Sequence, residues 1–96
     1  MAYLNEKERD DLLNKLKDMN FKKAKGKLER MDPEGRLAFY RNVQTVGKWM
    51  TRFDLTGLGT RVTLIEENHN PNQAGRNDND FELVEIIVEP LPGNRT

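Results

Sequence analysis

The sequence contains no cysteine and no serine, and it has a single histidine, His69. The missing cysteine excludes disulfides, thiolate metal sites and cysteine nucleophiles. Without serine and with one histidine, a single chain can build neither a serine–histidine catalytic pair nor a metal centre made from several histidines. Carboxylates, lysine, tyrosine and threonine remain as reactive groups. We therefore expect a non-catalytic protein with no cofactor and no metal site.

The sequence also lacks a long hydrophobic run. No window approaches the roughly 20 apolar residues of a membrane-spanning helix. The N-terminal residues turn polar at Asn5 and Glu6, without the apolar segment of a secretory signal. Together with the absence of cysteine, this predicts a cytoplasmic protein without a membrane contact. The length of 96 residues predicts a single domain, residues 1–96, built in two layers around one core.

The charged residues balance in number but not in position. Sixteen basic and sixteen acidic residues sum to zero, whereas residues 1–61 carry fourteen Lys or Arg against nine Asp or Glu, and residues 62–96 carry two against seven. The two parts therefore have net charges of +5 and −5. Such asymmetry bears on partners and association rather than on fold, because a basic surface attracts an anionic one.

Two helices are predicted in the N-terminal part. The first begins with Asn5 as its N-cap, with Glu8 placed to complete a capping box, and runs to about residue 18. The second follows Asn20 and has an apolar stripe at helical spacing, formed by Phe21, Ala24, Leu28 and Met31. Its other side carries Lys22, Lys23, Lys27 and Arg30.

A third helix is predicted over residues 33–53. Asp32 and Pro33 are typical of an N-cap and a first helical residue, and apolar residues from Phe39 to Phe53 recur along one side. At 100° per residue, the long polar side chains of this helix gather on the opposite side. They are Arg41, Gln44, Thr45, Lys48 and Arg52.

Two strands are predicted in the C-terminal part, over residues 60–67 and 81–89. In the second strand the apolar phase shifts between Leu83 and Val84, which indicates either a β-bulge or burial on both faces. Residues 68–80 hold five asparagines and only one apolar residue, Ala74, so they predict a long, mobile hairpin loop.

The predicted fold class is thus α+β. A three-helix part at residues 4–54 precedes a long-looped β-hairpin at residues 60–90, which packs on the third helix, and residues 91–96 form a flexible tail. The order helix, helix, helix, strand, long loop, strand resembles the outline of winged-helix DNA-binding domains. This resemblance implies that the third helix enters the major groove and that residues 68–80 form the wing.

The sequence departs from the winged-helix pattern at two places. The wing segment has one basic residue, Arg76, against Asp78 and Asp80, although a wing on phosphates favours Lys or Arg. The third helix is also long for a recognition helix. A break near Asn42 would shorten the recognition helix to residues 45–53.

These observations predict a small binding module with DNA or RNA as the leading partner. The predicted contacts are Lys22, Lys23, Lys27, Arg30, Arg41, Gln44, Thr45, Lys48 and Arg52, since Arg, Lys and Gln suit phosphates and base edges. The alternative is a protein-interaction or homo-oligomerising adaptor that uses its charge asymmetry, for example as a homodimer. In that alternative the second strand offers an edge to another chain. A solvated basic helix face, balanced by an acidic sheet, also remains open.

Overall fold

The computed structural model of this protein describes residues 3–41, 47–72 and 77–92, and within residues 36–41 it describes the backbone alone. Two helices come first in this part of the chain, α1 (Glu6–Leu16) and α2 (Phe21–Met31). Four strands follow: β1 (Arg36–Arg41), β2 (Lys48–Leu55), β3 (Thr60–Asn68) and β4 (Phe81–Pro90). The short 3₁₀ turns η1 (Thr56–Leu58) and η2 (Asp78–Asp80) precede β3 and β4.

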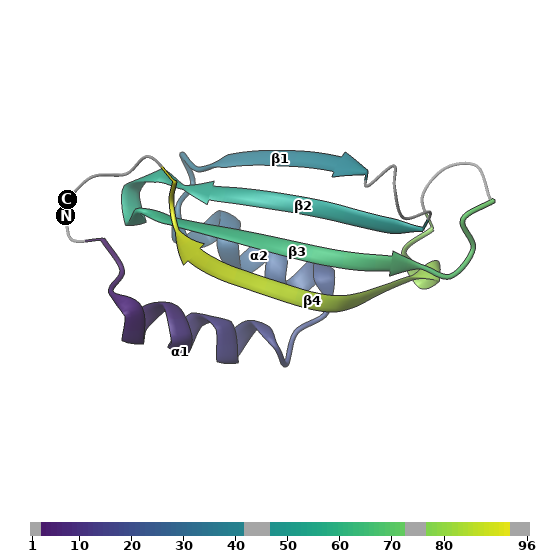
Figure 1. The fold of residues 1–96 in the computed structure, drawn as a ribbon, viewed down its shortest axis with the longest axis horizontal. Coiled ribbons are helices and arrows are strands. Elements are labelled where there is room, and N and C mark those ends of the chain that lie inside the picture. The colour runs from purple at the N-terminus through teal and green to yellow at the C-terminus, as the bar shows by residue number, and fades with distance from the viewer. Residues whose placement is uncertain (1–2, 42–46, 73–76, 93–96) are drawn as a thin grey trace.

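The strands form one antiparallel sheet in the order β1-β2-β3-β4, so each strand pairs with its neighbour in the sequence. Both helices form a second layer on one side of this sheet (Figure 1), where α1 packs against β4 and α2 against β2. The predicted α+β class is confirmed.

The two predicted helix starts are also confirmed. Asn5 Oδ1 accepts a hydrogen bond from Glu8 N at 2.8 Å, and Asn5 N donates to Glu8 Oε1 at 3.0 Å, which completes the capping box of α1. At α2, Asn20 Oδ1 accepts from Lys23 N at 2.9 Å. Each cap satisfies a backbone N–H that the helix itself leaves without a partner.

The core lies between the helices and the two central strands. Its buried apolar residues come from every second position of the strands and from one stripe of each helix, as the periods of the two structures require. They are Leu12, Leu16, Ala24, Leu28, Phe53, Leu55, Val62 and Leu64. On β3 this alternation also buries Thr60, Glu66 and Asn68 on the side that faces the helices.

The predicted third helix is wrong. Within residues 33–53 the structure has a turn, strand β1 and most of strand β2, and residues 42–46 lie outside the described residues. Gly47 has a φ of 90°, a conformation that no right-handed helix contains, and an added Cβ there would lie 3.1 Å from Asn68 O. Because β2 pairs with β3 along its whole length, tertiary hydrogen bonds replace the local ones that a helix would have made.

Asp32 does not begin a helix. It follows the end of α2, and its Oδ1 accepts from Glu34 N at 3.2 Å while its Oδ2 accepts from Gly57 N at 3.0 Å. Gly35 N donates to Asp32 O at 2.9 Å, which closes a tight turn before β1. The carboxylate that would have capped a helix therefore joins the α2–β1 turn to η1 instead.

The two C-terminal strands are confirmed, and of the two explanations for the apolar phase shift the structure shows the bulge. The register of β3 and β4 shifts at Ile65 and Glu66, which accounts for the change of apolar phase near Val84. These strands do not form a separate hairpin on a third helix, since β2 pairs with the other edge of β3. The winged-helix outline is accordingly wrong. Of the predicted mobile loop and tail, residues 73–76 and 93–96 lie outside the described residues.

Candidate nucleic-acid interface

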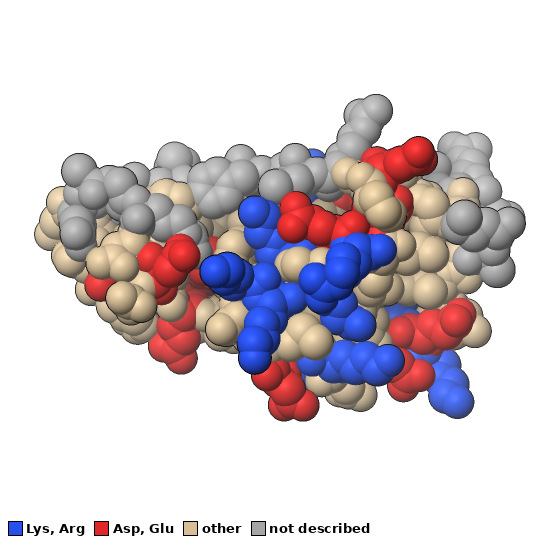
Figure 2. Space-filling model, turned by 180° about the vertical axis from the view of Figure 1, so that it is seen from behind, with Lys and Arg blue, Asp and Glu red and all other residues tan. Residues whose placement is uncertain are grey.

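Helix α2 carries five basic residues and one acidic residue among its eleven. Its apolar stripe faces the core through Ala24 and Leu28, which are fully buried. The 100° rotation per residue therefore turns Lys22, Lys23 and Arg30 outward, and all three are exposed. Figure 2 shows basic side chains gathered in the middle of the helix-covered side of the molecule, with acidic side chains around them.

The first turn of α2 is unusual in its charge. Partial positive charge from the exposed backbone N–H groups makes this end of a helix unfavourable for cations, by about 0.3–1 kcal/mol each at the surface. Helix α1 follows this preference with Glu6 and Glu8 in its first turn. Helix α2 has no acidic residue there and places Lys22 and Lys23 at that end instead. Positive charge is thus concentrated where it lowers the stability of the helix.

Arg30 adds to the same surface. An added Cβ at Gly26 would lie 3.1 Å from Nη1 of Arg30, so the guanidinium lies over Gly26, one turn back along α2. The missing side chain of Gly26 leaves the space that this arrangement uses. It brings the charge of Arg30 closer to the two lysines of the first turn.

Lys27 lies on another side of α2. It lines the groove between the two helices together with Glu8 and Asp11 of α1. Lys15 of α1 lines the same groove, and Lys27 is half-buried there, so it contributes less to the outward basic surface than the sequence pattern predicts. Lys25, which the sequence analysis did not single out, is half-buried at the opposite flank of the helix. The density of lysine in residues 22–27 is the signal that could have identified it.

The structure does not bring the other predicted contacts to this surface. Lys48 and Arg52 alternate along β2 with Thr51 and Phe53, which are buried on the helix side, so both lie on the face of the sheet away from the helices. Arg41 belongs to β1, where the backbone alone is described. Gln44 and Thr45 lie outside the described residues. The predicted nine-residue interface is therefore not a single surface.

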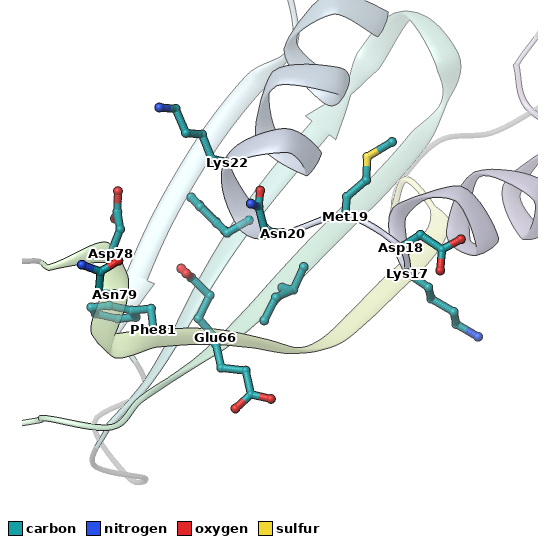
Figure 3. Close-up of a pocket in the computed structure, with 12 residues that line it drawn as sticks. Lys17, Asp18, Met19, Asn20, Lys22, Glu66, Asp78, Asn79 and Phe81 are labelled. Atoms are coloured by element: carbon teal, nitrogen blue, oxygen red, sulfur yellow. The ribbon is translucent and has the colours of Figure 1, made fainter.

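A hollow of about 550 Å³ lies beside the start of α2 (Figure 3). Its walls come from the α1–α2 turn, from η2 and from the beginning of β4, and the buried carboxylate of Glu66 in β3 lines it. Phe81 in its wall packs edge-on against Trp49, with ring centroids 5.1 Å apart and an angle of 79° between the rings.

The charges around this hollow do not suit a phosphate. Lys17 and Lys22 line it, but so do four carboxylates, those of Asp18, Glu66, Asp78 and Glu82. An anion placed there would meet a net negative surrounding. The hollow and the basic surface of α2 are therefore two separate features.

His69 is exposed and lies between two carboxylates at the end of the sheet. Its Nε2 is 3.0 Å from Glu82 Oε1, and its Nδ1 is 3.8 Å from Glu67 Oε1. Nowhere in the described part of the chain do three His, Asp or Glu side chains form a group that could hold a metal ion. No helix in residues 3–41, 47–72 or 77–92 is long and apolar enough to cross a membrane.

Comparisons with protein-family models, with curated proteins and with solved structures each found no match.

Proposed function

We propose that this protein is a small, non-catalytic nucleic-acid-binding module and that its contact surface is the outward side of α2. We call this surface the α2 basic side. It consists of Lys22, Lys23, Lys25 and Arg30, of which Lys25 is half-buried, and the exposed Glu29 lies beside them as the one acidic residue of this helix. The proposal keeps the ligand class indicated by the sequence but moves the contacts from two helices to one.

The observation that carries this proposal is the pair of lysines in the first turn of α2. A helix face that is merely solvated gains from acidic residues at this end, as α1 does with Glu6 and Glu8. Residues that oppose a local stability preference are expected where function requires them. Lysine side chains near the N–H groups of a helix start favour phosphate over other anions of lower charge.

The size of the α2 basic side suits a short stretch of nucleic-acid backbone. A helix of eleven residues is about 16 Å long, which matches about five phosphates of one strand at roughly 3.4 Å per nucleotide along a duplex axis. Four basic side chains that each neutralise one phosphate give a slope of about −3.6 for log affinity against log salt on duplex DNA. Binding of this kind depends little on base sequence, because phosphate contacts position a protein without reading bases.

Fluorescence anisotropy with labelled duplex DNA, single-stranded DNA and RNA tests the proposal. At ~50 mM salt, where electrostatic attraction is strong, we expect binding, and between ~50 and 200 mM salt we expect affinity for the duplex to fall roughly a hundredfold. A variant with Lys22→Glu and Lys23→Glu should lose at least about ten times in affinity, since two of the four attractive charges are reversed.

A matched control has the same change of net charge on α1, with Lys7→Glu and Lys15→Glu, both of which are exposed. This control should retain most of the affinity. The variant of α2 should stay folded and gain up to about 1 kcal/mol in the free energy of unfolding, because its new acids suit the helix end. Absence of binding to all three ligands at low salt, or equal losses in the two variants, would refute the α2 basic side as the contact surface.

A further inference from the structure

The face of the sheet opposite the helices is left uncovered by the described elements (Figure 1). We call it the open face. The alternation along each strand and the cross-strand register assign its side chains. From β2, β3 and β4 these are Lys48, Met50, Arg52, Asp54, Arg61, Thr63, Ile65, Glu67, Glu82, Glu85, Ile87 and Glu89.

Apolar and charged side chains share the middle of the open face. Met50 pairs with Ile65 directly across the two central strands, and Ile87 pairs with Thr63 one row further along. Thr63 is only 6% exposed although it points away from the core. Antiparallel sheets with one wet face normally alternate apolar inside with polar outside. The same two rows also hold Arg52 beside Thr63 and Glu85 beside Ile65. We call Met50, Ile65 and Ile87 the apolar centre, which has charged neighbours both at its ends and within its own rows.

Charged side chains occupy both ends of the open face, in pairs of opposite sign. At one end Arg61 Nε donates to Asp54 Oδ1 at 2.8 Å, and these two residues are direct partners in the register. At the other end Lys48 is the register partner of Glu67. On the two central strands, positive charge on one strand thus lies opposite negative charge on the other.

This arrangement makes the open face complementary to itself. A rotation of 180° about an axis parallel to the strands, midway between β2 and β3, turns the face of a second copy onto the first. It places β3 of that copy over β2. Lys48 then meets Glu67 of the second copy, Asp54 meets its Arg61, and Met50 meets its Ile65. A two-fold axis perpendicular to the strands also brings opposite charges together, Lys48 over Asp54 and Glu67 over Arg61, but it places Glu82 over Glu89, where like charges repel.

We propose that the open face binds a second copy of this chain in this two-fold arrangement. An isologous dimer of this kind uses the same patch of both copies, and its two-fold symmetry is the commonest symmetry of soluble oligomers. Stacked sheets pack about 10 Å apart with interleaved side chains. The apolar centre would be dehydrated together with Arg52 and Glu85, whose desolvation lowers the affinity, while the charge pairs at both ends would remain at a wetter rim.

The expected affinity is modest. Strands about 4.8 Å apart and roughly 25 Å long give a four-stranded face of roughly 500 Å² per copy, or about 1,000 Å² in total. This area is at the lower limit of specific protein interfaces, so we expect a dissociation constant on the order of micromolar. The proposal does not depend on nucleic-acid binding, and it is tested without any nucleic acid.

Sedimentation velocity over a range of protein concentrations tests the dimer. We expect the mass to rise from 11.2 kDa towards about twice that value as concentration increases. Ile65→Lys should weaken the dimer at least tenfold, because it places a charge in the apolar centre. The matched control is Val84→Lys at the bulge of β4, an exposed apolar residue outside this centre, and it should dimerise like the unaltered protein.

A mixing experiment tests the two-fold axis itself. In the proposed dimer Lys48 of each copy meets Glu67 of the other, which makes two such contacts. Lys48→Glu alone makes all four side chains in these contacts acidic, and Glu67→Lys alone makes all four basic. Each variant should therefore be monomeric. An equimolar mixture restores opposite charges in both contacts and should form a heterodimer. Circular dichroism checks that each variant is folded.

Three outcomes would overturn the proposal. The first is a protein that stays monomeric up to the highest soluble concentration. The second is a dimer that Ile65→Lys leaves unchanged, since another surface would then form the contact. The third is a dimer weakened by both charge reversals but not restored in their mixture, which would show a different arrangement of the two copies.

Discussion

At Asp32 a single carboxylate joins parts of the fold that are far apart in sequence. Its two oxygens accept from Glu34 N in the following turn and from Gly57 N in η1, 25 residues away. Asp is favoured both before a helix and in turns, because its short side chain bonds to nearby backbone N–H groups in either place. The residue type alone therefore does not distinguish a helix start from a turn. The distant partner, Gly57, decides between them here.

Two glycines offer a prediction at the residue scale. Gly26→Ala should raise the free energy of unfolding by up to about 1 kcal/mol, because alanine favours a helix interior and its Cβ meets the movable end of Arg30. Gly35→Ala should lower it by about 1–3 kcal/mol through overpacking, because the new Cβ would lie 3.0 Å from Asp32 O and 3.1 Å from Asp54 O, both backbone atoms.

Urea denaturation of the two variants measures both effects on the same scale. Each variant is the other's control, since both make the same chemical change. Equal stability of Gly35→Ala and the unaltered protein would contradict the tight turn before β1. A loss of stability in Gly26→Ala would show that the position of the Arg30 guanidinium over α2 is itself stabilising.

At the scale of elements, α2 differs from α1 in what its surface favours. The two helices have the same length and the same kind of N-cap, Asn5 and Asn20. Helix α1 adds a full capping box and acids in its first turn, whereas α2 adds neither and carries basic residues from its first turn to its last. The first pattern favours helix stability, and the second is the one that we propose for contact with an anion.

The loop between β3 and β4 gives a prediction that separates binding through the α2 basic side from binding through this loop. His69 N donates to Asp80 O at 2.8 Å, so these two residues can flank a short turn. Replacement of residues 70–79 by Asn-Gly closes a two-residue hairpin there. We expect the free energy of unfolding to stay equal or rise, because a shorter loop costs less entropy to close. Nucleic-acid affinity should stay unchanged, since α2 keeps its contacts.

Urea denaturation and fluorescence anisotropy of this loop variant check the two expectations. The Lys22→Glu and Lys23→Glu variant provides the reference for lost binding. If the shortened protein is folded but no longer binds nucleic acid, the loop takes part in binding and α2 is not sufficient. If it does not fold, the loop is a structural element.

At the scale of the whole molecule, the charge asymmetry of the sequence becomes a difference between two sides of the sheet. The basic residues of α2 lie on the helix side, and the three Glu of β4 at positions 82, 85 and 89 lie on the open face. Basic residues from β2 and β3 share that face and pair with acids across the strands. The side chains assigned to this face are three basic and five acidic, a net charge of −2, which disfavours contact with a polyanion.

A dimer through the open face would direct its two α2 basic sides away from each other, because in each copy α2 lies on the other side of the sheet. If both proposals hold, one dimer binds two nucleic-acid molecules. Capture on a biotinylated duplex, with a fluorescent second duplex in solution, should then recover the fluorescent duplex. Ile65→Lys should abolish this bridging while it preserves binding to one duplex. If the Ile65→Lys variant still bridges two duplexes, the dimer through the open face is not what causes the bridging.

Much of the fold was predictable from local patterns in the sequence. Asn5 with Glu8, and Asn20 before an apolar stripe, determine where the two helices begin, because those side chains satisfy backbone groups within one turn. The β-formers of residues 60–67 and the phase shift near Val84 indicated two strands and a bulge. The density of basic residues on the second helix was visible as well, and it is the part of the predicted interface that the structure keeps on one surface.

The secondary structure of residues 33–55 was decided by tertiary pairing. Thr51, Phe53 and Leu55 alternate with Arg52 and Asp54, a period-two signal for a strand, but the apolar residues from Phe39 to Phe53 also fit a helical stripe. A strand needs a partner for its hydrogen bonds, and the partner of β2 is β3, which follows it in the chain. With that pairing Lys48 and Arg52 move to the open face, away from α2. By itself the sequence determined the helix starts, the last two strands and the chemistry that the chain lacks, because these depend on residue types and near neighbours. The choice between helix and sheet for residues 33–55 depended on long-range pairing, and that choice also divided the basic residues between two surfaces.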